Sequence, residues 1–364
     1  MGRPQILSLR ERLDADEAAT GKGVCVALVD LGFHAHPDLL HPRKRIRAFV
    51  DVSRDTPRAR DLYSPRASSW HGTMTACTAV GSGYVSGGRF SGLASDAEVV
   101  LIKIEAGDHA TIRGDQVAAA IRLPLRHPEL GIRLLNVSLG VSADDPHVAD
   151  VLAAVREATA AGVAVFAAAG NDPGAPVEAP GSSPHAITVG GSNDGGTRAP
   201  DDDTEFGSSH SGNKPDLVAP ASGLPAPMLP GTLVAREAIA LYQLLGVLEE
   251  ASAEQDFAAE TGESIGDDAR ASLASFCEAV EARMKRGKYV SPDHQHVDGT
   301  SFAAPIVMSV AAQMLEVAPR LTPAQLREGL VSTAMPLANV PRGSQGAGVV
   351  HPRAAVEWAR RHAR

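Results

Sequence analysis

Four side chains of types that take part in hydrolytic chemistry stand at the ends of predicted elements. Asp30 ends a short apolar strand, His71 opens a His-Gly-Thr segment, Asn171 follows a run of alanines, and Ser301 precedes an apolar helical pattern. A serine hydroxyl is a weak nucleophile at neutral pH until a base such as histidine takes its proton. Each residue also has a structural explanation when taken alone, because turns and helix caps favour Asp, Asn and Ser. Their shared position at element ends favours a common catalytic role.

The elements that must position these residues alternate between strand and helix. Apolar, β-branched runs predict buried strands at 24–29, 99–104, 134–139 and 163–169. Helical patterns separate them, most clearly over 146–161, which Gly162 ends. Such alternation predicts parallel strands with right-handed crossovers. We therefore expect a three-layer α/β fold, an open and mostly parallel sheet with helices on both faces, whose functional groups collect at the carboxyl ends of the strands.

The segment 222–298 departs from this pattern. Its apolar residues indicate two helices, one through Leu233, Ile239, Leu244 and Leu248 and a second through Leu273, Phe276, Val280 and Met284. Acidic residues at the start of the second helix and basic residues at its end suit the helix dipole. We expect an inserted helical hairpin with an acidic, flexible connection over 254–267. It lies outside the core as a regulatory or recognition element that could contact a partner chain or a substrate.

The amino-acid composition indicates which binding partners and which cellular compartment suit the protein. The 364 residues carry a net charge of −9, which argues against a nucleic-acid partner. No run of about 18 apolar residues predicts a membrane span. Residues 1–20 lack the apolar core of a secretory signal, and Cys25, Cys77 and Cys277 form no disulfide or metal framework. We expect a cytoplasmic protein, although a secreted protein shown without its leader would look the same.

Around the four residues the sequence resembles the subtilisin-like serine proteases, the subtilases. The similar segments include 27–30 with His-Pro-Asp-Leu at 36–39, His-Gly-Thr at 71–73, and Gly-Thr-Ser-Phe-Ala-Ala-Pro at 299–305. The chain order Asp, His, Ser is the subtilisin order. The resemblance implies a catalytic domain over 21–364, interrupted by the insertion at 222–298 and preceded by a short extension at 1–20. Cys77 replaces a glycine common in the family, and we expect it to be a small buried core residue.

The resemblance also implies a role for each of the four residues. Ser301 would be the nucleophile and His71 the general base, while Asp30 would hold the imidazole in the required tautomer. The Asn171 amide and the Ser301 backbone N–H would bind the oxyanion. These roles together describe a serine endopeptidase that works through an acyl-enzyme.

Members of this family bind a peptide or protein substrate as an extended strand. By resemblance, the walls of the specificity pocket are Ser138, Leu139 and Gly140 on one side and Ala168, Ala169 and Gly170 on the other. Aligning 177–181 with the family places Glu178 at the pocket floor, where a carboxylate would favour Arg or Lys before the scissile bond. An exposed loop glutamate is the alternative explanation.

The expected chemistry requires no cofactor. Asp201, Asp202, Asp203 and Glu205 could hold a structural calcium ion, although a solvated acidic loop explains them more simply. Two other functions stay open: a peptide-maturation enzyme or transpeptidase that acts on a dedicated peptide, and a catalytically silent peptide-binding scaffold. Because all four catalytic positions are filled, an active enzyme is favoured.

Overall fold

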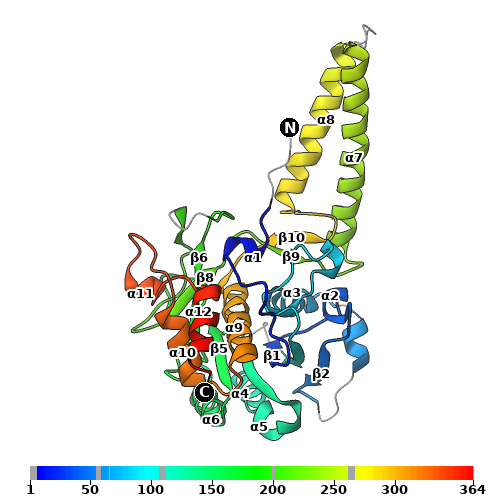
Figure 1. Ribbon diagram of the computed structural model, residues 1–364. Coiled ribbons are helices and arrows are strands. Elements are labelled where there is room, and N and C mark those ends of the chain that lie inside the picture. Colours follow the sequence, from blue (N-terminus) through cyan, green and yellow to red (C-terminus); the bar gives the residue numbers. More distant parts are fainter. Residues whose placement is uncertain are drawn as a thin grey trace. The chain divides into compact units, whose positions relative to one another are not determined.

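The computed structural model describes residues 6–54, 59–64, 66–105, 112–198, 202–260 and 267–363. They group into two compact units, one within Met1–Leu224 and Val297–Arg364 and the other within Pro225–His296 (Figure 1). The first unit contains all four candidate catalytic residues.

The first unit is built on an eight-stranded sheet. Seven strands follow the order β2-β3-β1-β4-β5-β6-β7, and β8 also pairs with β6. All pairings are parallel except that between β6 and β7. The predicted α/β class with a mostly parallel sheet is therefore confirmed. The strands are β1 Cys25–Asp30, β2 Ile46–Asp51, β3 Glu98–Lys103, β4 Ile132–Val137, β5 Ala164–Ala168, β6 Ile187–Asn193, β7 Thr204–Glu205 and β8 Leu217–Pro220.

Helices cover both faces of this sheet, as the fully buried strand β1 requires. On one face, alternate residues of β1 such as Ala27 and Val29 join a core cluster with α4 (Gly114–Ile121) and α6 (Val148–Ala160). On the other face, α9 (Thr300–Val317) packs on β4, β5, β6 and β8, and α3 (Ser69–Val80) packs on β1. Each buried Val, Leu or Ile contributes about 1.5–3 kcal/mol. This packing holds the amino ends of α3 and α9 against the sheet.

Within the described residues, α9 alone has the length and apolar composition that could cross a membrane. Its 18-residue window is 83% buried inside the protein. The burial explains its composition, because a helix that is covered on most sides is apolar all round.

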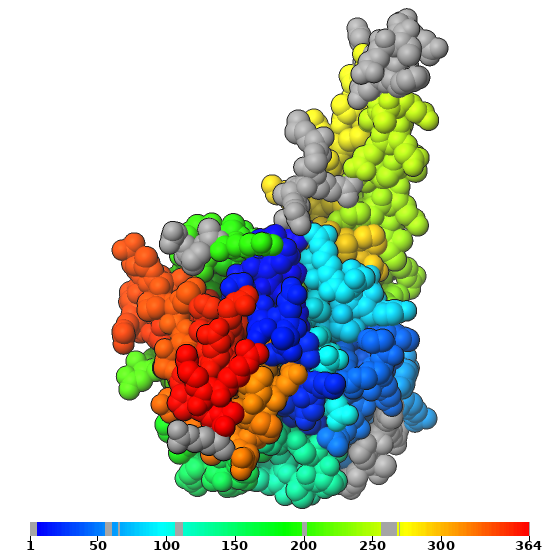
Figure 2. Space-filling view, viewed as in Figure 1, coloured from blue at the N-terminus to red at the C-terminus, as the bar shows by residue number. Residues whose placement is uncertain are grey.

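Ion pairs and hydrogen bonds attach residues 12–14 to other parts of the first unit. The buried Arg12 guanidinium donates to Asp194 and to the carbonyls of Ser222 and Gly223. In the same region Arg353 pairs with Asp14 at 2.9 Å. Figure 2 shows the C-terminal helix in red beside the first described residues in blue. The remaining helices of this unit are α1 Leu9–Arg12, α2 Pro37–Leu40, α5 Leu123–Arg126, α10 Pro323–Ser332, α11 Arg342–Gln345 and α12 Pro352–Arg361, with 3-10 turns at Ala59–Tyr63, Tyr84–Ser86 and Pro128–Leu130.

The second unit contains the two helices predicted for the insertion, α7 (Leu233–Glu260) and α8 (Asp267–Arg286). Strands β9 (Leu224–Pro227) and β10 (His294–Val297) pair at its base. The predicted connection over 254–267 is wrong in part, because α7 stays helical to Glu260; residues 261–266 lie outside the described part of the chain.

The buried face of α7 also differs from the prediction. Leu245 and Leu248 form the hairpin core with Val280 and Met284 of α8. Of the residues predicted for this face, only Leu248 is buried, whereas Leu233, Ile239 and Leu244 are exposed. Phe276 of α8 is exposed as well. The prediction failed because α7 carries apolar residues on more than one side, so periodicity alone did not identify the side that faces α8.

Candidate active site

Asp30 and His71 meet where the end of β1 approaches the first turn of α3. His71 Nδ1 donates to Asp30 Oδ2 over 2.6 Å, and the Leu31 N–H donates to Asp30 Oδ1 over 2.8 Å. The Asp30 side chain is 2% exposed and that of His71 is 23% exposed. Because an ionised carboxylate only accepts hydrogen bonds, the proton lies on Nδ1 and the neutral ring offers Nε2 as its basic nitrogen.

Gly72 makes this approach possible. A Cβ at residue 72 would lie 2.4 Å from the Gly32 carbonyl oxygen and 2.7 Å from the Asp30 Cβ. No side chain fits there, since real Cβ atoms do not come that close to neighbouring atoms. The glycine after His71 is therefore needed for α3 to begin against the end of β1.

The environment of His71 acts on its pKa in two directions. Burial of the ring opposes its protonation, whereas the charge of Asp30 and its hydrogen bond favour it. The favourable interactions prevail, and the pKa of His71 is raised above its ordinary value. A histidine in this setting is a stronger base than a free imidazole.

Ser301 lies in the first turn of α9, after Gly299, whose φ of 128° suits glycine. Pro305 lacks an N–H, so the Ser301 carbonyl has no i+4 partner within the helix. The Ser138 hydroxyl donates to this carbonyl over 2.8 Å and itself accepts from Asn136 at 2.9 Å. The Ser301 hydroxyl donates to the Ser138 carbonyl over 3.4 Å. These bonds attach the start of α9 to the end of β4.

The His71 ring lies close to the same turn of α9. Its centroid is 5.8 Å from that of Phe302, the residue after Ser301, with the rings at 62°. Trp70 meets the His71 ring edge-on at 5.4 Å. The structure thus brings the histidine from α3 and the serine segment from α9 into one neighbourhood.

Asn171, three residues after the end of β5, is held by Thr300. The Thr300 N–H and hydroxyl both donate to Asn171 Oδ1, over 2.8 and 3.0 Å. The Asn171 NH₂ group is therefore the end of the amide that can donate to a ligand. Backbone N–H groups in a first helical turn, such as that of Ser301, have no acceptor within their helix. The arrangement supplies two donors at the start of α9.

Sequence reasoning did not single out Thr300 or the hydroxyl of Ser138, which orient Asn171 and the start of α9. Thr300 is almost fully buried, and its hydroxyl also accepts from the Gly170 N–H over 3.2 Å. The available signal was its place next to Ser301, where a buried hydroxyl needs hydrogen-bond partners.

A pocket of about 440 Å³ opens beside Ser301. Its walls come from the carboxyl ends of β4 and β5 and from the segment after Asn171. Among the described residues, neither Leu139 nor Gly140 has a hydrogen bond. Their backbone groups can therefore pair with an extended peptide. The structure brings into this one pocket all the residues that the sequence suggested for it, namely Ser138, Leu139, Gly140, Ala168, Ala169, Gly170 and Glu178, together with Asn171 and Ser301.

Of the two explanations that the sequence left open for Glu178, the exposed loop glutamate agrees with the structure, and the buried carboxylate does not. Glu178 lines the pocket but is exposed, and its carboxylate lies against Gly140. Val177 and Ala179, on either side of Glu178, are buried, so the Glu178 side chain lies on the outer side of this segment. Asp172 also lines the pocket, and none of its lining residues is Lys, Arg or His. The pocket is therefore acidic, and both of its carboxylates are exposed.

The acidic loop proposed for calcium does not assemble a site within the described residues. Asp201 lies outside them, and Asp202 accepts from the Thr197 hydroxyl over 3.0 Å. Burial, together with the charges of Asp194 and Asp202, raises the pKa of Asp203 to about 6. Among the described residues, the carboxylates of this loop do not place three ligand atoms within 4.8 Å of one another.

His36, Asp38 and Cys77 do place three potential ligand atoms within 4.8 Å, and all three residues are buried. The neighbouring Arg45 guanidinium donates to the carbonyls of Asp38 and Val80, which puts a positive charge beside the group. Burial and then the Asp38 charge raise the pKa of the Cys77 thiol. A protonated thiol beside a guanidinium is a poor cation site, and the prediction that Cys77 is a buried core residue is confirmed.

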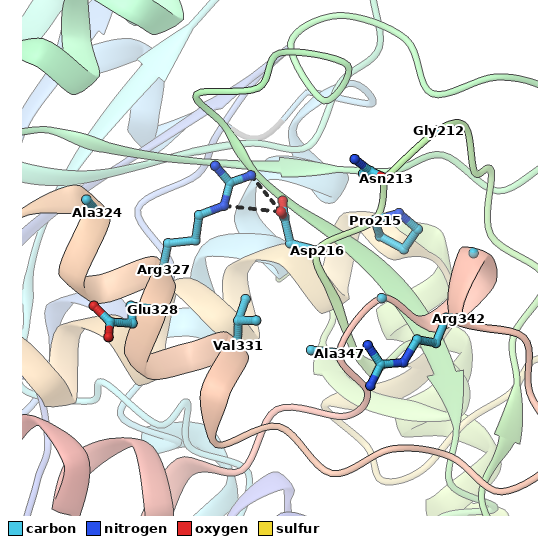
Figure 3. A pocket seen from close by; sticks show the side chains of 12 residues that line it. Gly212, Asn213, Pro215, Asp216, Ala324, Arg327, Glu328, Val331, Arg342 and Ala347 are labelled. Atoms are coloured by element: carbon cyan, nitrogen blue, oxygen red, sulfur yellow. Dashed lines mark hydrogen bonds and ion pairs between the residues drawn. The ribbon is translucent and has the colours of Figure 1, made fainter.

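A larger pocket, of about 530 Å³, lies away from the four catalytic candidates, between β8, α10 and α11 (Figure 3). Of its two acidic lining residues, Asp216 and Glu328, Asp216 accepts from the Arg327 guanidinium at 2.6 Å and from Lys214 Nζ at 2.7 Å. Arg327 also donates to the Pro184 carbonyl over 2.6 Å. These bonds join α10 to the start of β8 and to the Pro184 segment, so the network stabilises the fold.

Comparisons with known proteins point to one family. The subtilase family matches residues 21–350. The chain is 27% identical to serine protease AprX of Bacillus subtilis, over 86% of this chain and 61% of AprX, and 26% identical to Mycosin-1 of Mycobacterium tuberculosis, over 95% and 71%. The chain thus spans about three fifths of the length of AprX. A solved protease structure from Pseudoalteromonas arctica shares the fold, with a TM-score of 0.63 and 22% identity over 97% of this chain and 94% of that one. The family match covers most of the sequence, and this chain belongs to the subtilase family.

Proposed function

We propose that this chain is a serine endopeptidase that hydrolyses peptide bonds through an acyl-enzyme. The observation that carries the proposal is the 2.6 Å hydrogen bond between His71 and the buried Asp30, beside the helix start that bears Ser301. An oriented base next to a nucleophile at a helix start is the arrangement that acyl transfer requires. Membership of the subtilase family and the names of the curated relatives support the same chemistry.

In the proposed first step the Ser301 hydroxyl turns from the Ser138 carbonyl towards His71. The oxygen attacks the peptide carbonyl carbon while His71 Nε2 takes the proton. The carbonyl oxygen becomes an oxyanion, which the Asn171 NH₂ group and the Ser301 N–H stabilise. The C–N bond then breaks, His71 gives its proton to the leaving amine, and an ester on Ser301 remains.

In the second step water replaces the amine. His71 takes a proton from water, the resulting hydroxide attacks the ester carbon, and the acid product leaves as Ser301 recovers its proton. Asp30 stays ionised throughout and stabilises the imidazolium that forms twice in each cycle. The raised pKa of His71 suits this role, because a stronger base takes the serine proton more readily.

We propose that the substrate binds as an extended strand against Leu139 and Gly140 and prefers Arg or Lys before the scissile bond. The preference rests on Asp172 and Glu178, the carboxylates among the pocket's lining residues. Because both are exposed, solvent weakens their attraction and the preference should be several-fold rather than absolute. Glu178→Gln should reduce it, with Glu205→Gln as an exposed control outside the pocket. An undiminished basic preference would mean that Glu178 is not its cause.

A peptide-library digest of wild type beside Ser301→Ala tests the proposed function. Hydrolysed products from wild type and none from the variant are expected. Products of ligation or cyclisation would instead indicate a transpeptidase, and binding without products would indicate a silent scaffold.

Calcium and the cytoplasmic location stay predictions. A fall of the thermal unfolding midpoint on addition of EDTA would support a structural calcium ion, and an unchanged midpoint would contradict it. Cys25, Cys77 and Cys277 are free thiols, as a reducing compartment would keep them. Cell fractionation with an antibody against the chain tests the location.

A further inference from the structure

The hairpin of α7 and α8 carries an exposed apolar patch, formed by Leu244, Val247 and Phe276. Their exposed fractions are 36%, 62% and 52%. The hairpin core is made by other residues, so none of these three is needed to hold the helices together. Large exposed apolar side chains that gather in one place are typical of an interaction surface.

One ion pair and one hydrogen bond between the two helices show how the residues of the patch are aligned. Arg283 of α8 donates to Glu237 of α7 over 2.7 Å, near the base of the hairpin. Arg270 donates to the Gln255 carbonyl at the other end, so the helices are antiparallel. Leu244 lies one heptad from Glu237, towards the tip of the hairpin.

Phe276 of α8 lies one heptad from Arg283, also towards the tip of the hairpin. Residues a heptad apart lie on the same side of a helix. Leu244 and Phe276 therefore lie level with each other on the side of the hairpin marked by the Glu237–Arg283 pair. Val247 lies about one turn further along α7, next to Leu244.

Charge is distributed unequally on the two sides of this patch. Glu254 lies seven residues beyond Val247 towards the tip, about 10 Å away along α7. Arg286 lies ten residues beyond Phe276 towards the base, about 15 Å away along α8. Near the base Glu237 and Arg283 neutralise each other, so Arg286 leaves the face basic there, while its middle is apolar and its tip end is acidic.

A surface with this pattern is complementary to itself. A two-fold rotation about an axis through the patch places the apolar residues of two hairpins together. The same rotation brings Glu254 of each copy towards Arg286 of the other. We propose that this face binds a second copy of the chain and that two hairpins pair antiparallel about this axis. Such an isologous contact closes after two copies, as most symmetric dimers do. This proposal does not depend on the proposed peptidase activity.

The size of the face sets the expected affinity. The 20 residues of α8 span about 30 Å, and two adjacent helices are about 20 Å wide. One face therefore offers about 600 Å², or about 1,200 Å² for both copies, the lower limit of a stable specific interface. We expect a dimer that dissociates in the micromolar range.

Sedimentation equilibrium of the full chain at micromolar concentrations tests the proposal. Wild type should be a monomer–dimer mixture, and Val247→Glu with Phe276→Glu should be monomeric. Ile239→Glu is the matched control, because Ile239 is 40% exposed but lies on a different side of α7. Circular dichroism should show unchanged helix content in all variants. A wild type that stays monomeric, or a double variant that still dimerises, would overturn the proposal.

A charge-swap experiment tests the antiparallel orientation. Glu254→Lys and Arg286→Glu should each weaken dimerisation, since each faces a like charge in the symmetric dimer. Mixing the two variants should restore association, because both inter-copy pairs are then oppositely charged. Failure of the mixture to associate more strongly than either variant alone would rule out this orientation.

Discussion

Gly72→Ala should impair the proposed catalysis without removing any functional group. The added methyl would lie 2.7 Å from the Asp30 Cβ and 2.4 Å from the Gly32 oxygen, whereas carbon atoms pack at about 3.5–4.0 Å. The start of α3 must therefore move by about 1 Å from the end of β1. A shift of about 1 Å at a catalytic group costs about 10²-fold in rate. Overpacking should also lower the free energy of unfolding by about 1–3 kcal/mol.

The assay is kcat on a short chromogenic peptide, with the thermal unfolding midpoint measured in parallel. Gly246→Ala is the matched control: it is also a glycine within a helix, but nothing lies within 4 Å of its added Cβ. That variant should keep full activity and become slightly more stable, by about 1 kcal/mol. If Gly72→Ala retains wild-type kcat and midpoint, the close approach of α3 to Asp30 does not limit activity and the reasoning is wrong.

Three further variants test other contacts. Asp30→Asn should lower kcat about 10⁴-fold and move the acid limb of the pH–rate profile to lower pH, since Asp30 raises the pKa of His71; an unmoved limb would contradict that cause. Asn171→Ala should lower kcat about 10²- to 10³-fold, the range known for such a donor in subtilisin, with little change in KM; a defect in KM alone would exclude an oxyanion role. Asp216→Ala should lower the free energy of unfolding by about 3–5 kcal/mol, because Lys214 loses its carboxylate partner; an unchanged denaturant midpoint would show that the network contributes nothing.

The sequence predicted the parts of this site that depend on where elements end. The carboxyl ends of parallel strands lie at one edge of the sheet. The sequence therefore predicted that Asp30 and the pocket walls after β4 and β5 lie near one another. The His-Gly-Thr and Gly-Thr-Ser segments added the starts of α3 and α9. These features follow from hydrophobic periodicity and local motifs, which can be recognised in the sequence.

Side-chain orientation and loop burial could not be predicted in this way. The Thr300 bonds to Asn171 and the Ser138 bond to the Ser301 carbonyl join residues more than 100 positions apart. Glu178 is exposed because of the path of its loop, which no periodic pattern specifies. The side of α7 that faces α8 was ambiguous because apolar residues occur around much of the helix.

The proposed nucleophile is tested most directly by covalent labelling with a fluorophosphonate. The probe reacts with a serine whose hydroxyl is activated by a base, and peptide mass analysis then locates the adduct. We expect one adduct, on the peptide that contains Ser301, at a rate that falls strongly in His71→Ala. Ser301→Ala should take no label, although its fold is unchanged by circular dichroism. An adduct on another serine, or an unlabelled Ser301 in a sample that still cleaves peptides, would contradict the proposed triad.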